Sequence, residues 1–195
     1  MLGGAVKRVW IAALAGVVVV GGVACGGDDD EEESTGSTAR SATAAPTTTL
    51  DEETRKEEAA KAAYLAYWDA FERASAEPVD PTSRDLLDRM TGDQARLVVR
   101  NLEEMQASGQ AARSPANSQS RHQVSATELQ ADGSVRIIDC QVDDAVVYDT
   151  TSGAVVNDAV VTSLVSATMV QDGTAWKVAL AERTKKWPGA VECAA

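Results

Sequence analysis

Hydrophobic residues are concentrated at the start of the chain and in its second half. An apolar run begins at Val9, directly after Lys7 and Arg8, and ends in small residues before Cys25. A basic start, an apolar core of about fifteen residues and a small-residue exit are typical of a secretory signal. A bilayer span needs about twenty apolar residues, so this run is too short to cross comfortably. The pattern predicts a signal peptide over residues 1–24.

Residues 25–49 carry almost no hydrophobic surface. After Cys25 come two glycines and six consecutive acidic residues, and then a stretch of Ser, Thr, Ala and Gly with a single proline and a single arginine. No side chain there is apolar and larger than alanine, so nothing can be buried to offset the entropy of ordering. We expect a disordered, extended tether.

A helix is predicted to start near Thr49. Glu52 lies three residues after Thr49, which is the spacing of a capping box. Apolar residues then recur at helical spacing until the chain reaches Pro78, predicting one amphipathic helix of about 25 residues. Aromatic residues make up 4% of the chain, yet four lie within eight residues of this helix: Tyr64, Tyr67, Trp68 and Phe71. Ordinary core packing explains them best, and the lining of a ligand pocket is the alternative.

Two further helices are expected before the pattern changes. Leu86, Leu87 and Met90 fit a short helix, and Asp93–Ala107 fits a longer one that stops at Gly109. Residues 110–120 are expected to be an irregular crossing.

After residue 120 the spacing of the hydrophobic residues changes from the helical period of 3.6 residues to the strand period of 2 residues. Candidate strands span residues 123–130, 135–148, 154–171 and 174–184, and turn signals rich in Asp and Gly separate them. The third run is long for one strand, so a bend or bulge is expected within it. In the last run Trp176, Val178 and Leu180 are expected to share one face. Helices followed by a four-stranded antiparallel meander give the α+β class, with N-terminal helices packed on a curved sheet.

The net charge disfavours one class of binding partner, and the cysteine content predicts a disulfide. The formal net charge of −12 disfavours binding to nucleic acid. Three cysteines are present, and with Cys25 assigned to the signal, Cys140 and Cys193 remain as a pair. In an exported domain a disulfide is the favoured state, stabilising the fold by roughly 4 kcal/mol, and two free thiols are the alternative.

The candidate chemistry is sparse. His122 is the single histidine, which rules out a metal site built from several histidines. Asp69 is expected to face water. Asp139, Asp143 and Asp144 lie in or beside a strand, where a solvated sheet edge explains them better than carboxylates facing a pocket. No phosphate-binding glycine loop, serine-nucleophile elbow or Cys/His pair is found. We assign no catalytic residue, metal or cofactor.

The last residues form a small basic patch. Lys185 and Lys186 precede Trp187, and the patch is expected to be a solvated turn that leads to Cys193.

The signal ends in Val23-Ala24-Cys25, which resembles the lipobox of bacterial lipoproteins. The resemblance implies a lipid on Cys25, cleavage before it, and attachment to the extracytoplasmic face of the cell membrane. Gly22 departs from the pattern, because an aliphatic residue is usual there. The alternative is an ordinary signal peptide cut near Ala24.

The domain expected over residues 50–195 is similar, from about residue 55 onward, to the NTF2-like (cystatin-like cone) domain of small actinobacterial lipoproteins. The resemblance is carried by residues 64–71 (YLAYWDAF), Asp139-Cys140, residues 173–178 (GTAWKV) and Cys193. It implies a curved sheet wrapped around helices and enclosing a conical pocket, and it implies no single activity.

Two functions follow as expectations. The first is a non-catalytic, membrane-anchored module that binds a small apolar ligand or a protein partner. The alternative is a ketosteroid-isomerase-like or SnoaL-like enzyme displayed at the cell surface.

Overall fold

The computed structural model describes residues 47–193, which belong to one compact unit, Ala44–Ala195. The predicted signal peptide, Cys25 and the tether up to residue 46 lie outside the described residues. The helices come first, in the order α1 (Thr47–Ser75), α2 (Arg84–Leu87) and α3 (Gly92–Ala107). The strands follow as β1 (Gln110–Arg113), β2 (Arg121–Leu129), β3 (Val135–Asp143), β4 (Val146–Asp149), β5 (Val155–Asn157), β6 (Val161–Asp172) and β7 (Ala175–Pro188).

Helix α1 is the central element of the core. Its buried positions repeat at three- and four-residue spacing, as an amphipathic helix requires: Ala60, Tyr64, Tyr67, Ala70 and Ala74. The helix begins at Thr47, two residues before the expected start. An N-cap residue lies just outside the helical turns, so the capping box predicted at Thr49 is wrong.

The strands form two antiparallel sheets rather than one meander. The main sheet has the order β2-β3-β6-β7, and a small sheet has the order β1-β4-β5. The two long β-rich runs of the sequence each break, after Asp143 and again at residues 158–160, so that β4 and β5 leave the main sheet. Residues 110–113, expected to be irregular, pair with β4 as strand β1. The α+β class is confirmed. The four predicted strand regions pair antiparallel in chain order, as expected, in the main sheet, whereas the small sheet of β1, β4 and β5 was not predicted.

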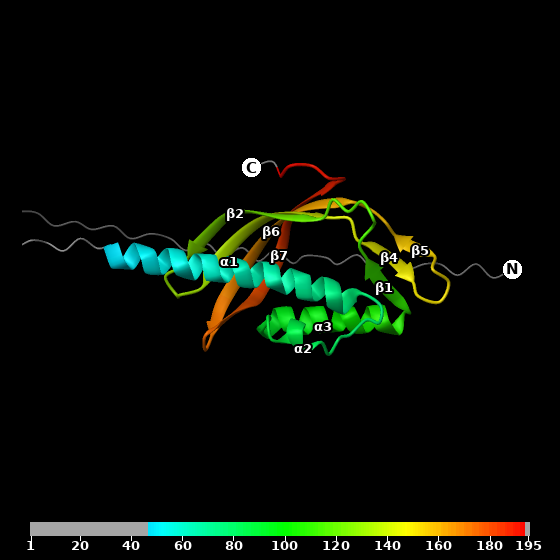
Figure 1. Cartoon of the computed structure of the whole chain (residues 1–195), viewed down its shortest axis with the longest axis horizontal. Coiled ribbons are helices and arrows are strands. Elements are labelled where there is room, and N and C mark those ends of the chain that lie inside the picture. Colours follow the sequence, from blue (N-terminus) through cyan, green and yellow to red (C-terminus); the bar gives the residue numbers. More distant parts are fainter. Residues whose placement is uncertain (1–46, 194–195) are drawn as a thin grey trace, which may run out of the picture. The chain divides into compact units, whose positions relative to one another are not determined.

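The helices and sheets form layers. Figure 1 shows α1 between the main sheet and the pair α2 and α3, with the small sheet beyond the C-terminal end of α1. Helix α1 contacts β2, β3 and β7, and α3 contacts β7. The core between these layers is therefore built on one side by the aromatic stripe of α1 and on the other by inward-facing residues of the main sheet, including Ile137, Ala167, Met169 and Val178.

A bulge in β7 reverses the expected face of Leu180. Thr168 pairs with Leu180 and Met169 pairs with Val178, so Ala179 is an extra residue in β7. One extra residue inverts the alternation of side chains along a strand. Trp176 and Val178 are therefore buried, whereas Leu180 is 40% exposed, and the single face predicted for all three is wrong.

Strand β7 also continues beyond its predicted end. Lys185 and Lys186 pair with Leu164 and Ser163 of β6, and Trp187 pairs with Thr162. The solvated turn predicted for this basic segment is wrong, because the backbone of the segment lies in the main sheet.

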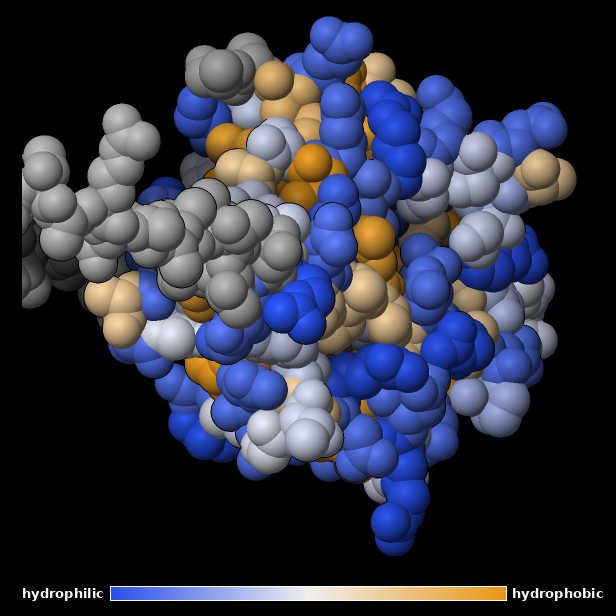
Figure 2. Space-filling view, turned by 60° about the vertical axis from the view of Figure 1, so that its left-hand side comes forward, coloured by the Kyte–Doolittle hydropathy of each residue, from blue (hydrophilic) through white to orange (hydrophobic). Residues whose placement is uncertain are grey.

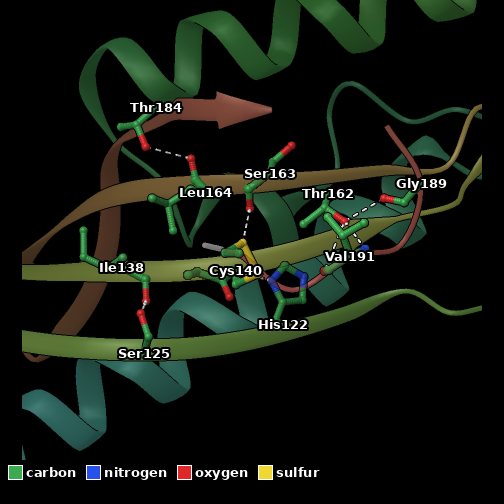
Figure 3. Close-up of a disulfide and its surroundings, with 12 residues drawn as sticks. His122, Ser125, Ile138, Cys140, Thr162, Ser163, Leu164, Thr184, Gly189 and Val191 are labelled. Atoms are coloured by element: carbon green, nitrogen blue, oxygen red, sulfur yellow. Dashed lines mark hydrogen bonds and ion pairs between the residues drawn. A yellow bond between two sulfur atoms is a disulfide. The ribbon is translucent and has the colours of Figure 1, made fainter. Parts of the chain in front are cut away.

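Hydrogen bonds and a disulfide join the segment after β7 to the main sheet. The Thr162 hydroxyl donates to the carbonyl of Gly189 over 2.7 Å and accepts from the Val191 amide over 2.9 Å (Figure 3). Cys193 is disulfide-bonded to Cys140 of β3, so the expected pairing is confirmed. Together these contacts join the C-terminal segment to β3 and β6.

The surface is mostly hydrophilic. Figure 2 shows small, separate hydrophobic patches between larger hydrophilic areas on the face it presents. The exposed large hydrophobic residues are Leu97, Val155, Val156, Leu180 and Val191, which come from several different elements.

Asp144 is buried, contrary to the expected solvated edge. Its carboxylate accepts hydrogen bonds from the Ser118 hydroxyl over 2.7 Å and from the Gln119 amide. Burial works to raise the pKa of this carboxyl, but the two donors outweigh it, and the pKa is lowered. Asp144 thus fastens the loop before β2 to the end of β3.

Asp144→Ala is expected to lower the free energy of unfolding by about 2 kcal/mol at pH 7, because two donors lose a charged acceptor. The folded-state pKa is lowered, so the contribution is present above the ordinary pKa of 3.8 and is lost as the pH falls through the folded-state value. Urea unfolding at pH 7 and at acid pH measures both effects. The exposed control Asp158→Ala should change stability by less than about 0.5 kcal/mol, and equal losses in the two variants would contradict the assignment.

Candidate functional site

A cleft of about 590 Å³ lies where the C-terminal half of α1 meets the two sheets. Residues of α1, α3 and six of the strands contribute to its walls. Its apolar lining includes Trp68, Phe71, Met105, Val147 and Val161. Concave, partly apolar spaces of this size are the usual form of small-molecule sites.

The four aromatic residues predicted on the first helix fall into two groups. Trp68 and Phe71 line the cleft, with their ring centroids 5.8 Å apart. Tyr64 and Tyr67 are fully buried in the core. Trp68 and Phe71 also pack against the core, so core packing accounts for all four residues, and two of them face the cleft as well.

Tyr67 connects three elements beneath the cleft. Its hydroxyl accepts a hydrogen bond from Gln94 Nε2 of α3 over 2.8 Å, and Gln94 Oε1 accepts from the Ala181 amide of β7 over 3.1 Å. Burial raises the pKa of Tyr67 to about 12. The tyrosine is a neutral structural contact that holds α1, α3 and β7 in register.

A second buried contact joins α1 to the sheet through Asp139. The Tyr64 hydroxyl donates to Asp139 Oδ2 over 3.0 Å, and His122 Nδ1 lies 2.6 Å from the same oxygen. Asp139 is 0% exposed, and its other oxygen, Oδ1, has no partner within residues 47–193. Burial, and next the charge of Asp139, raise the pKa of Tyr64. The solvated edge predicted for Asp139 is wrong, because β3 is a central strand and this side chain faces α1.

Trp68 links the cleft to this buried group. Its ring lies 5.3 Å from the His122 ring at an interplanar angle of 30°, and 6.2 Å from the Tyr64 ring. The His122 side chain is 18% exposed. The imidazole therefore sits behind the aromatic wall of the cleft, with Asp139 behind it.

The sequence analysis did not predict this contact between His122 and Asp139, although a signal for it was present. The turn at residues 130–134 folds β2 onto β3, and His122 pairs with Gln141 while Val124 pairs with Asp139. His122 and Asp139 are therefore diagonal neighbours on one face of the hairpin. Counting residue pairs along the hairpin from the turn predicts that His122 and Asp139 lie near each other. A bulge between Val124 and Ala126 shifts the true pairing by one residue from this count.

Charged side chains occupy different parts of the cleft wall. Asp69 and Glu72 come from α1 and Asp143 from the end of β3, whereas Arg183 and Lys186 come from β7. Asp69 is exposed, as expected from the sequence. Partial burial, and then the charge of Asp69, raise the pKa of Glu72. Arg73 and Arg113 also line the cleft, Arg73 paired with Asp85 and Arg113 lying over the ring of Tyr148. The cleft wall therefore carries charges of both signs.

Neither a metal cluster nor a membrane-spanning helix is found in the part of the chain that the structure describes. No group of three or more His, Cys, Asp or Glu side chains is close enough to hold an ion there. None of its helices combines the length and hydrophobicity that a bilayer crossing requires.

These elements define an α+β domain with a cleft between its helices and two antiparallel sheets. No family model matches the chain, and no curated protein matches it. Among solved structures, the chain is similar to the intermembrane space region of the chloroplast protein ARC6, with a TM-score of 0.52 and 13% identity. The match covers 69% of this chain and 97% of that one. At this identity the similarity shows the fold alone.

Proposed function

We propose that this protein is an exported lipoprotein, anchored through Cys25 at the extracytoplasmic face of the membrane, whose domain binds a small ligand without transforming it. We further propose that the domain belongs to the NTF2-like class, with α1 held in the curve of the main sheet. The observation that carries the binding function is the cleft of about 590 Å³ with Trp68 and Phe71 in its wall. Partly exposed aromatic surface beside polar groups is the usual composition of a ligand site.

A cleft-filling substitution tests the binding function. Ala159 is exposed and lines the cleft, so Ala159→Trp should occupy the space without disturbing the core. Native mass spectrometry of the full chain, after exposure to a small-molecule and lipid extract, should show a bound species that Ala159→Trp loses. The control is Ala154→Trp, at an exposed position outside the cleft. Absence of any bound species, or equal binding by both variants, would argue against the proposal.

The anchor is tested separately. Cys25→Ser should move the protein from the membrane fraction to the soluble fraction of the producing cell, because the thioether lipid has no other attachment point. Cell fractionation and intact-mass measurement follow the two forms. An unchanged membrane fraction would contradict the anchor and leave the ligand-binding function as it stands.

A second candidate function, an enzyme of the ketosteroid-isomerase-like or SnoaL-like kind, is favoured by the contact between His122 and Asp139. With its proton on Nδ1, the imidazole donates to the buried carboxylate and leaves Nε2 as a base. The ligand identified above, incubated with the protein in deuterated water, should then exchange a carbon-bound hydrogen. His122→Gln should abolish this exchange, and a ligand recovered unlabelled from the unaltered protein would exclude the candidate.

A further inference from the structure

We propose that the cleft takes a short peptide of about three residues with free termini, its ammonium held at the α1 side and its carboxylate at the β7 side. This inference rests on the proposed ligand-binding function and specifies the chemistry of the ligand.

The carboxylate subsite follows from the strand register. Gln141 of β3 pairs with Ser163 of β6, and Ser163 pairs with Lys186 of β7. Residues directly opposite each other project from the same face of a sheet. Gln141 and Lys186 both line the cleft, so Ser163 between them faces the same way. This row supplies an amide, a hydroxyl and an ammonium, all able to donate hydrogen bonds to an anion.

The donors of this row are not used elsewhere in the fold. Ser163 is 3% exposed, yet its hydroxyl makes no hydrogen bond to any residue the structure describes. Lys186 and its neighbour Arg183, which also lines the cleft, have no ion-pair partner within residues 47–193. Two cations and a hydroxyl that no protein group engages, all at one wall, are the features of an anion site.

The ammonium subsite lies on α1. Asp69 and Glu72 are three residues apart, so they project from one face of the helix into the cleft. Partial burial, and then the charge of Asp69, raise the pKa of Glu72, which is consistent with two carboxylates lying close together on this helix face. Arg73, the cation next to them in sequence, is engaged by Asp85 at 2.6 Å. The face of Trp68 beside them is suited to a cation as well.

The separation of a carboxylate and a cation across the main sheet sets the length of the ligand. Asp143, the carboxylate of the acidic side that lies in the sheet, is on β3, and Lys186 lies two strands away on β7. Two strand spacings of about 4.8 Å place the backbones of these two residues about 10 Å apart. No ion pair joins the acidic and basic groups of the cleft, as this separation requires. An extended peptide spans about 3.4 Å per residue, so about three residues bridge the gap.

The walls also discriminate against other ligand classes. A wholly apolar ligand would desolvate the charged side chains of both walls, which is costly where they are left without a partner. A phosphorylated ligand would meet the repulsion of three carboxylates. A peptide with two free termini satisfies both walls and places its central side chain against Phe71 and Met105.

Isothermal titration of the full chain in detergent tests the inference. The probes are Ala-Phe-Ala with free termini, its N-acetyl form and its C-terminal amide, with Ala-Leu-Ala and tri-alanine as side-chain variants. Removing either terminal charge should weaken binding by about tenfold, since a hydrogen bond to a charged group contributes about 1.5 kcal/mol or more.

Variants of the two walls locate the termini. Lys186→Gln should weaken binding of the free peptide about tenfold. It should also remove the difference in affinity between the free peptide and its amide. Asp69→Asn combined with Glu72→Gln should remove the difference in affinity between the free and the N-acetyl peptide. The controls are Lys185→Gln, which pairs with Leu164 and faces the opposite side of the sheet, and Glu58→Gln, which lies on α1 outside the cleft. Both controls should bind as the unaltered protein does.

Three results would overturn the inference. Capped peptides could bind as tightly as the free one, the controls could lose as much affinity as the wall variants, or no probe could bind at concentrations up to about 10 mM. If the extract experiment nevertheless yields a neutral ligand that Ala159→Trp excludes, the binding function stands and the peptide chemistry is wrong. If neither experiment finds a ligand, both proposals fail.

Discussion

Asp139→Ala is expected to lower the free energy of unfolding by about 3 to 5 kcal/mol, because breaking a buried charged contact leaves its partners without compensation. The substitution removes the oxygen that accepts from Tyr64 and faces His122 Nδ1. Both partners lie between α1 and the main sheet, where water reaches them poorly. Equilibrium urea unfolding at pH 7 measures the loss.

Tyr64→Phe is the matched control for this prediction. It removes one hydroxyl and keeps the ring, so it should cost only about 1 kcal/mol. A loss below about 1 kcal/mol for Asp139→Ala would mean that the carboxylate is compensated by water, and it would contradict the structural role assigned here.

Cys140→Ser is expected to lower the free energy of unfolding by about 4 kcal/mol under oxidising conditions. The disulfide closes a loop with a sequence separation of 53 residues, and opening that loop enlarges the unfolded ensemble. The loss should appear as a lower thermal midpoint and a lower urea midpoint.

Cys193→Ser should reproduce the effect, because either substitution opens the same loop. Adding a reductant should lower the stability of the unaltered protein towards that of both variants. A thermal midpoint that differs by less than about 2 °C between oxidised and reduced protein would contradict a stabilising disulfide.

The sequence predicted the elements that depend on local periodicity. The α+β class, the extent of α1 up to Ser75 and the pairing of Cys140 with Cys193 follow from spacing and residue type alone. The bend within the third β-rich run was also predicted, and residues 158–160 provide it. These features need no knowledge of distant contacts.

The features that sequence reasoning missed depend on pairing. A bulge at Ala179 places Leu180 on the exposed face of the sheet. The residue types of β7 do not predict this bulge. The burial of Asp139 depends on α1 packing against this face of β3, and the composition of β3 does not specify that contact. Asp144 is buried because a loop 25 residues earlier supplies its donors. The candidate site is assembled from these long-range placements, so its residues could not be recognised as a group.

The two sheets differ in their resistance to local opening, which has a consequence for observing the cleft. The strands of the small sheet span only three or four residues, and β5 exposes Val155 and Val156. Segments with few buried contacts open at a low free-energy cost, so their amide hydrogens exchange early, while the long β6–β7 ladder exchanges late. Ala112, Val147 and Asn157 of the small sheet line the cleft. Hydrogen–deuterium exchange at β1, β4 and β5 will therefore slow when the cleft is filled, and it reports occupancy even for a ligand too weak to raise the melting temperature.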